Sequence, residues 1–220
     1  QKMRKSTVGF DSETYGAIAG IDGMLSDNLF AGIAAGYTDT KLKLKNFKKG
    51  DTVDSKGMLF SIYASYNFDN NMFVRGSTLA SRSNIKTHEK QVLVSTAHGK
   101  YTSTSYGAEV AAGYRHNVEW LTISPEAGVR ALAFNDTGYT EEGGYSRTVA
   151  KRSGNSVDGF LNLGVTGNFE SGDAKIMPSV RAGVEHQLSA KTPEVSMRLD
   201  GQVGSAFVSK SKSVNNTRYS

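Results

Sequence analysis

The chain has 220 residues, no cysteine and a formal net charge of +5, and no stretch of it reaches the about 18 consecutive apolar residues that a membrane-spanning helix requires. These features exclude a helical membrane protein and a disulfide framework. They leave membrane barrels open, because a barrel strand is apolar on one face only. The positive charges fall mostly between the expected strands, which argues against one basic face, so we expect no nucleic-acid partner.

Apolar and polar residues alternate with a period of two in eight segments along the chain. The predicted strands cover residues 15–25, 29–38, 58–68, 72–81, 105–115, 121–133, 158–169 and 175–187. In each of them about nine to eleven residues keep one apolar face, the length that a tilted strand needs to cross the hydrocarbon layer. The chain is therefore predicted to be all-β and to meander through successive hairpins.

Short and long connections alternate between these strands. Tight turns rich in Asn, Asp, Ser and Gly are expected at 26–28, 69–71, 116–119 and 170–173. Long polar loops are expected at about 39–56, 84–103, 135–156 and 188–205. Short turns at one end and long loops at the other are typical of an antiparallel up-and-down transmembrane β-barrel.

The segment Leu29–Tyr37 shows how one strand leaves the membrane. It is apolar on one face and rich in glycine, and it continues without a turn signal into a stretch that carries Lys41, Lys43 and Lys45. We expect the apolar part to cross the bilayer, with Tyr37 at the interface and the lysines beyond it, near an anionic surface.

The composition of the two faces favours a barrel with its apolar face toward lipid. That face consists of small and medium residues with aromatic residues near the strand ends, and it lacks the bulky residues of a packed core. The other face carries Arg and Glu, which pair well in a narrow wet lumen. The predicted lumen-facing charged residues are Arg75, Glu109, Arg115, Glu126, Arg130, Arg181 and Glu185. The predicted aromatic girdle is Tyr15, Tyr37, Tyr66, Phe68, Tyr106, Tyr114 and Phe169.

No catalytic or metal-binding motif is visible. The four histidines are His88 and His98 in one predicted loop, His116 at a turn and His186 at a strand end, and none has ligand spacing. No glycine-rich phosphate loop and no nucleophile–base–acid set can be assembled. We therefore expect no enzyme, no cofactor and no metal.

Three quoted stretches resemble the translocator domains of autotransporters. "YGAIAGIDGMLSDNLFAGIAAGYTDTKLKLKN" is similar to their second and third strands, and "SKGMLFSIYASYNFDNNMFVRG" to the next hairpin. "GKYTSTSYGAEVAAGYRHNVEWLTISPEAGVRALAF" is similar to the pair after it. Within this family of type V secretion, the pattern resembles the rickettsial surface-antigen group that is like outer membrane protein B. The resemblance covers most of the chain.

This resemblance implies a twelve-stranded barrel in the bacterial outer membrane, with long loops outside and short turns in the periplasm. Such a domain exports and anchors an N-terminal passenger, an adhesin or surface antigen, with help from the barrel-assembly machinery. Its further partners would be outer-membrane lipid and lipopolysaccharide, and its loops could contact a host surface. Because only eight strands are visible, we expect residues 1–220 to be one fragment of the domain, an incomplete barrel that lacks the first strand and the last ones.

Two questions stay open at the level of sequence. The lumen charges would either contact the passenger's linker helix or merely pair with one another to offset their own burial. The chain could also be a soluble ligand-binding β-barrel, which would shield Ile33 and Val110 at its centre, or another outer-membrane barrel such as a porin. A porin usually carries an acid-rich constriction loop, and none is visible.

Overall fold

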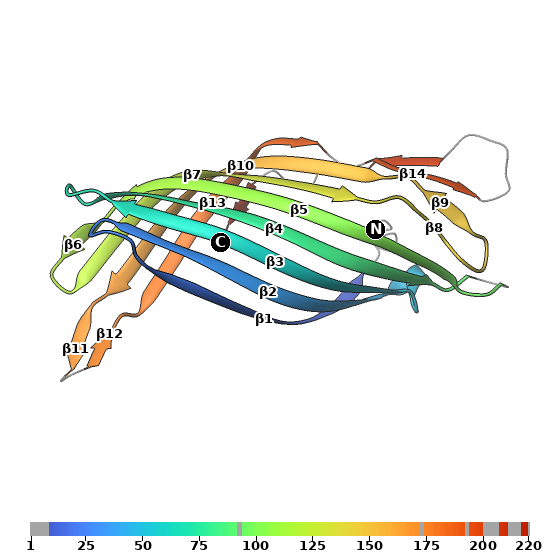
Figure 1. Cartoon of the computed structure of the whole chain (residues 1–220), viewed down its shortest axis with the longest axis horizontal. Coiled ribbons are helices and arrows are strands. Elements are labelled where there is room, and N and C mark those ends of the chain that lie inside the picture. The colour runs from blue at the N-terminus through green and yellow to red at the C-terminus, as the bar shows by residue number, and fades with distance from the viewer. Residues whose placement is uncertain are drawn as a thin grey trace, which may run out of the picture.

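A computed structural model describes residues 9–91, 94–171, 174–191, 194–199, 207–210 and 217–219. Ten strands form one antiparallel sheet in which nearly every strand lies beside its neighbour in the chain. In spatial order the strands are β1 (Phe10–Met24), β2 (Leu29–Leu44), β3 (Thr52–Asn67), β4 (Met72–Glu89), β5 (Ala97–Tyr114), β7 (Leu121–Asp136), β10 (Arg152–Gly167), β13 (Ser179–Lys191) and β16 (Thr217–Tyr219), with β6 (His116–Val118) paired to β7. The sheet curls, so that β1 to β5 lie in front and β10 and β13 lie behind them in Figure 1.

Short strands and one 3₁₀ turn lie at the two ends of the sheet. At the end where the connections are long, called the loop end below, β8 (Tyr139–Thr140), β9 (Arg147–Val149), β14 (Glu194–Leu199) and β15 (Phe207–Lys210) form a second sheet of four strands. A 3₁₀ turn, η1 (Asn46–Lys48), lies between β2 and β3 at the same end. At the opposite end, called the turn end, β11 (Phe169–Ser171) and β12 (Ala174–Ile176) form a small hairpin that projects from the sheet (Figure 1).

No helix within the described residues is long and apolar enough to cross a membrane.

All eight predicted strands are present, and seven of them are longer than predicted, whereas β13 has the predicted length but lies four residues further along the chain. The predicted loop 39–56 shrinks to 45–51, because β2 continues to Leu44 and β3 begins at Thr52. The predicted loop 84–103 shrinks in the same way to 90–96. The predicted strands end where the alternating apolar face ends. The pairing continues further, because backbone hydrogen bonds do not require an apolar face.

The other connections also differ from the prediction in detail. The loop 135–156 contains β8 and β9, and the described part of 188–205 contains the end of β13 and β14. The turns at 26–28 and 69–71 are tight as predicted, and Asn71 adopts a φ of 65°, which asparagine tolerates. Of the turn predicted at 116–119, residues 116–118 form β6, which pairs with β7. Of the turn predicted at 170–173, residues 170–171 belong to β11, and residues 172–173 lie outside the described residues.

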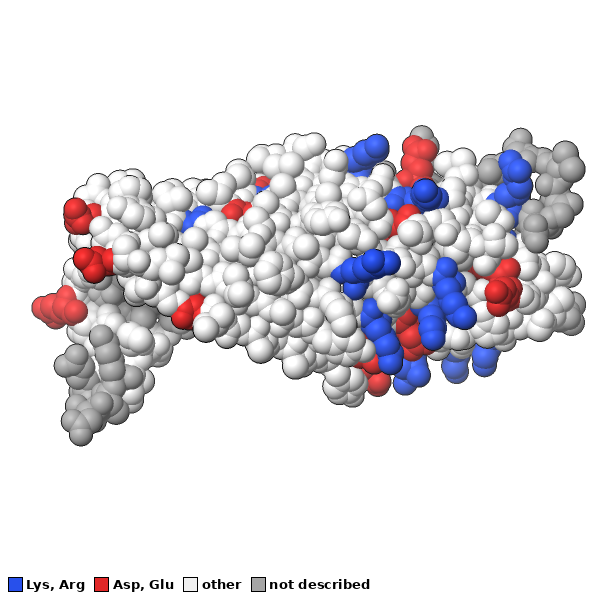
Figure 2. Space-filling model, in the orientation of Figure 1, with Lys and Arg blue, Asp and Glu red and all other residues white. Residues whose placement is uncertain are grey.

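The burial of side chains is inverted relative to a soluble barrel. Ile33 and Val110 are 46% and 49% exposed, whereas Glu126 and Asp158 on the other face are buried. Figure 2 shows a wide outer band that is almost free of charged side chains. A soluble barrel needs the opposite arrangement, so this alternative is wrong. Among the described residues, β1 pairs only with β2 and β16 only with β13, so the sheet does not close.

Glycines on the inner face allow rings to lie across neighbouring strands. A Cβ at Gly32 would lie 2.6 Å from the ring of Tyr63, whose hydroxyl donates a hydrogen bond to Asp22 at 2.6 Å. The ring of Phe160 covers Gly128 in the same manner. These glycines therefore provide close approach that no other residue permits.

Replacing Gly128 tests whether this close approach is required. In Gly128→Ala the new methyl group would lie 2.6 Å from the backbone oxygen of Val110 and 2.8 Å from the Cβ of Ala111, so we expect a loss of about 1–3 kcal/mol in unfolding free energy. The matched control is Gly164→Ala, whose nearest neighbours lie at 3.6 Å and 3.7 Å. Denaturant unfolding in detergent measures both variants, and equal effects at the two glycines would contradict the packing argument.

Candidate functional site

Eight charged side chains of the inner face and one asparagine form one connected group, which we call the inner cluster. Its members are Arg75, Glu109, Glu126, Arg130, Asp158, Asn162, Arg181, Glu185 and Arg218. They come from β4, β5, β7, β10, β13 and β16, so the cluster spans most of the sheet. Four arginines face four carboxylates, and the cluster carries no formal net charge.

Arg75 is the centre of the cluster. Its Nε and Nη2 donate to the two carboxylate oxygens of Glu126 at 3.0 Å and 2.9 Å, and its Nη1 donates to Glu109 at 2.6 Å. This bidentate geometry is the strongest form of an arginine–carboxylate pair. Strand register brings the partners together. Glu109 of β5 lies directly opposite Ser77 of β4, two residues from Arg75, and directly opposite Arg130 of β7.

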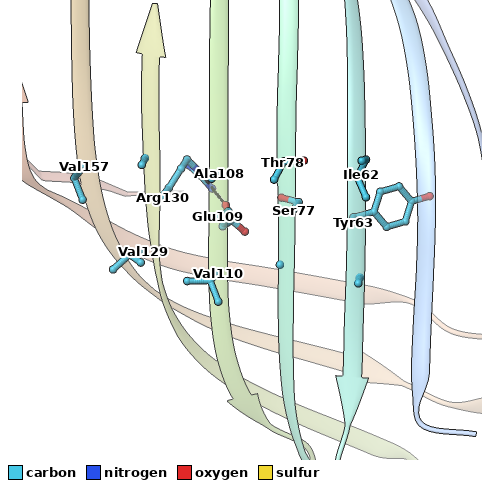
Figure 3. A pocket seen from close by; sticks show the side chains of 13 residues that line it. Ile62, Tyr63, Ser77, Thr78, Ala108, Glu109, Val110, Val129, Arg130 and Val157 are labelled. Carbon is cyan, nitrogen blue, oxygen red and sulfur yellow. Dashed lines mark hydrogen bonds and ion pairs between the residues drawn. The ribbon is translucent and has the colours of Figure 1, made fainter. Parts of the chain in front are cut away.

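The cluster extends from Glu109 toward the far strands. Arg130 Nη2 lies 2.7 Å from Glu109, and its Nη1 donates to Glu185 at 2.9 Å (Figure 3 shows the contact between Glu109 and Arg130). Arg218 then lies 3.2 Å from Glu185 and 3.3 Å from Asp158. The acids thus alternate with arginines, and each carboxylate in the chain of contacts has a cationic partner.

The cluster is buried at one wall and open at its far side. The side chain of Glu126 is 4% exposed and also accepts a hydrogen bond from Asn162 at 2.8 Å, whereas the guanidinium-bearing side chain of Arg181 is 61% exposed. The buried ring of Phe160 lies beneath Arg75 and Arg130, with their guanidinium carbons 6.0 Å and 5.5 Å from its centre. Such a site can hold its own charges in place and offer arginine donors to a chain inside the barrel.

Six of the seven predicted lumen residues belong to the inner cluster, and Arg115 does not. Arg115 follows the end of β5, where it donates to Asn67 and lies over Phe73 at 4.5 Å. The ring of Phe73 thus gives it a separate site near the turn end. Sequence reasoning missed Asp158, Asn162 and Arg218 as members. Asp158 and Asn162 could have been found because they share the polar face of one predicted strand, but Arg218 stands in a strand of three residues without any periodic context.

The predicted aromatic girdle residues are all exposed, as their role requires. They fall into a loop-side row of Tyr15, Tyr37 and Tyr106 and a turn-side row of Tyr66, Phe68, Tyr114 and Phe169. Trp120, which the prediction left out, stacks on Phe169 at 5.3 Å in the turn-side row. Tyr106 and Tyr114 are eight residues apart, about 26 Å along β5 and roughly 20 Å along a tilted barrel axis, near the ~25 Å height of an outer-membrane apolar band. Their assignment as a girdle stays a prediction.

A second charged group ties the loops together at the loop end. Lys48 of η1 lies 2.9 Å from Glu89 of β4, and Arg147 of β9 contacts Glu89 and binds both oxygens of Glu141 at 2.8 Å. Burial of Glu89 works to raise its pKa, but the hydrogen bonds from Lys48 and Arg147 prevail and hold that pKa below the ordinary value of 4.5. Three hairpins are thereby fastened to one another outside the apolar band.

The histidines do not gather into a site. His88 and His98, expected in one loop, lie directly opposite each other on β4 and β5 with their rings 4.9 Å apart. Within the part of the chain that the structure describes, no group of three or more His, Cys, Asp or Glu residues is placed to hold a metal ion.

Comparison with known proteins bears directly on this architecture. The family model described as "Autotransporter beta-domain" matches residues 1–220. The chain belongs to this family. It is therefore an outer-membrane translocator barrel of an autotransporter, and it is not an enzyme.

The relatives of this chain include outer membrane proteins of Rickettsia. The autotransporter β-domain is 33% identical to outer membrane protein A of Rickettsia rickettsii over 213 residues, which cover 91% of the chain and 10% of that protein. It is 27% identical to outer membrane protein B of Rickettsia typhi over 231 residues, which cover 100% of the chain and 14% of that protein. The chain thus spans only about a tenth of the length of these relatives.

Solved structures of low sequence identity share the fold. The translocator domain of the autotransporter NalP from Neisseria meningitidis superposes with a TM-score of 0.71 at 12% identity, covering 91% of this chain and 74% of that one. The β-domain of the Bordetella autotransporter BrkA superposes with a TM-score of 0.60 at 16% identity, covering 87% and 80%. The all-β antiparallel barrel class predicted from the sequence is thereby confirmed.

Removing one buried carboxylate tests the energetic role of the inner cluster. Glu126→Gln leaves Arg75 and Arg181 facing a neutral group, so we expect a loss of about 2–3 kcal/mol in unfolding free energy. Glu13→Gln, which disturbs an exposed pair with Lys43 at 3.9 Å, is the control and should cost less than about 0.5 kcal/mol. Combining Glu126→Gln with Arg75→Gln should recover part of the loss in denaturant unfolding, and strict additivity would contradict the pairing.

Acidification should remove the stabilisation that the charged group at the loop end provides through Glu89. Since the pKa of Glu89 is lower in the folded than in the unfolded protein, its stabilisation is fully present above 4.5 and disappears as the pH falls through the folded value. The difference in melting temperature between wild type and Glu89→Gln should therefore be largest near neutral pH and vanish in acid. Glu119→Gln at the turn end is the control, and a difference that grew on acidification would refute the assignment.

Proposed function

We propose that this domain passes a linker of its passenger along the inner cluster during export and then holds that linker in the lumen. In this proposal the loop end faces the cell surface, the turn end faces the periplasm, and the barrel-assembly machinery helps insertion. The passenger is a surface antigen or adhesin, by likeness to the rickettsial relatives, and the loops contact lipopolysaccharide and a host surface.

One observation carries the proposal, namely that the inner face is polar and internally neutral while the outer face is apolar. The acids of the inner cluster are already compensated, so a passing chain meets no fixed net charge that would trap it. The exposed guanidinium groups of Arg181 and Arg218 still offer donors that suit backbone carbonyls or acidic side chains. In this proposal the open side of the cluster contacts the linker, and the buried side serves structural pairing.

Two leucines support a path beside the cluster. Leu79 shares the inner face of β4 with Arg75, and Leu132 shares the inner face of β7 with Arg130. Both are exposed, and both lie near Gly107, where an added Cβ would be 3.0 Å from Leu132 and 3.5 Å from Leu79. An exposed apolar patch beside arginines suits an amphipathic segment.

We also propose that residues 1–220 are one part of the barrel domain. This part lacks the first strand of the domain and its last ones. Among the described residues β1 and β16 each have one edge without a paired strand, which supports this proposal because an unpaired backbone group in hydrocarbon costs several kcal/mol.

Narrowing the inner face tests the export path in the full-length protein. Leu79→Trp combined with Leu132→Trp should reduce surface display of the passenger at least about fivefold while the barrel still folds. The reason is that the two indole rings are larger than the leucine side chains and narrow the path along the inner face. Leu161→Trp combined with Leu163→Trp enlarges the outer face instead and should leave display unchanged. Antibody labelling of intact cells measures display, and resistance to unfolding in cold detergent reports folding. Equal display in both variants would remove the proposed path.

A further inference from the structure

The outer face of β1 to β5 carries a shallow groove of about 870 Å³ on the loop side of the apolar band. Small and large side chains alternate across it in register, because Ala35 lies opposite Phe60, Phe60 opposite Ala80, and Ala80 opposite Tyr106. The aromatic rings therefore form the sides of the groove, and the alanines form its bottom. The groove is almost entirely apolar apart from one cation, Arg82, which lies at its loop-side end.

Arg82 is an outward cation for which the described residues provide no acidic partner, and it has two neighbours of the same kind. Lys86 lies four residues along the same face of β4, and Lys100 of β5 is its direct cross-strand partner. Among the described residues, no ion pair joins any of the three to an acid. Asp54, which lies opposite Lys86 on β3, is 3.6 Å from His88 instead.

Three other outward lysines at this level have acidic partners, whereas Lys41 of β2 has none among the described residues. The paired cations are Lys43 with Glu13, Lys45 with Asp11 and Lys56 with Asp39. Figure 2 shows basic side chains gathered just beyond the uncharged band on this face. Two like charges directly opposite each other destabilise a ladder, so the pair of Lys86 and Lys100 calls for an external anion.

We propose that this groove is a binding site for a glycolipid with acyl chains and two phosphates. An acyl chain lies between Phe60 and Tyr106, and the phosphates neutralise Arg82 at one level and the Lys86–Lys100 pair at the next. Arg82 and Lys86 are roughly 13 Å apart along β4, which suits two phosphates separated by a sugar unit better than a single phosphate. The inference rests on the proposed orientation, in which the loop end lies in the outer leaflet.

Binding of purified lipid A to the full-length protein tests this site. The lipids are diphosphoryl lipid A, the same lipid with both phosphates removed, and phosphatidylglycerol, and native mass spectrometry in neutral detergent measures bound lipid. The test variant is Arg82→Gln/Lys86→Gln/Lys100→Gln. Its control is Lys43→Gln/Lys45→Gln/Lys56→Gln, which removes an equal number of positive charges from the same face.

We expect the test variant to lose at least about tenfold in affinity for diphosphoryl lipid A, and the control to lose less than about threefold. Removing the phosphates from the lipid should reproduce the loss in wild type. A groove-filling variant, Ala80→Phe, should weaken lipid A binding while Arg82, Lys86 and Lys100 remain.

The outcomes separate the site from the export function. Equal losses in the two triple variants, or equal binding of phosphatidylglycerol and lipid A, would overturn the glycolipid site while passenger display by the wild type kept the proposed function intact. Failure of the wild type both to display its passenger and to enter a bilayer would overturn the proposed function and the site together.

Discussion

Inside a hydrocarbon layer every backbone N–H and C=O must find its hydrogen-bond partner within the protein, and most of this structure follows from that constraint. The meander meets it by pairing each strand with its chain neighbour over long, unbroken registers, such as the 18 paired positions of β4 and β5. Successive side chains in a strand point to opposite faces, so one strand must suit lipid on one side and water on the other. The period-two sequence and the inverted burial of Val110 and Glu109, neighbours in β5, are two consequences of the same geometry.

A barrel built this way has no ordinary apolar core, and the inner face is stabilised by other means. Two of the few buried apolar residues, Phe73 and Phe160, each lie beneath arginine and beside a glycine of the next strand. The ring fills the space above the glycine and offers its face to a guanidinium group, which binds carboxylates above Phe160 and the amide of Asn67 above Phe73. Packing and electrostatics thus depend on the same few contacts, and the glycine content that marks the sequence is part of this arrangement.

These features explain how far the sequence could be interpreted. Alternation predicted all eight long strands and six members of the inner cluster, because side-chain direction follows from the strand period alone. It could not predict where strands end, since Lys43 and Thr52 pair beyond the band with no apolar face to mark them. It also could not assign partners, because the meeting of Arg75 with Glu126 depends on cross-strand register and on long side chains reaching over β5. Arg115 has the same period as Glu109 yet stands apart, because the ring of Phe73 accommodates it near the turn end.

The contrast between inner and outer charges is then a matter of which medium supplies the counter-ion. On the inner face part of the cluster is buried, so a charge left there without a protein partner would carry the cost of its desolvation. Each carboxylate of the inner cluster accordingly has an arginine partner. On the outer face beyond the apolar band, solvent and head groups lie within reach of every side chain. Lys86 and Lys100 can therefore stand opposite each other without a protein anion. Lys56 lies opposite Asn84, two residues along β4 from Arg82, and it pairs with its direct cross-strand partner Asp39. An acid could therefore have been placed at this level, and since none among the described residues pairs with Arg82, the membrane surface itself is the source of negative charge.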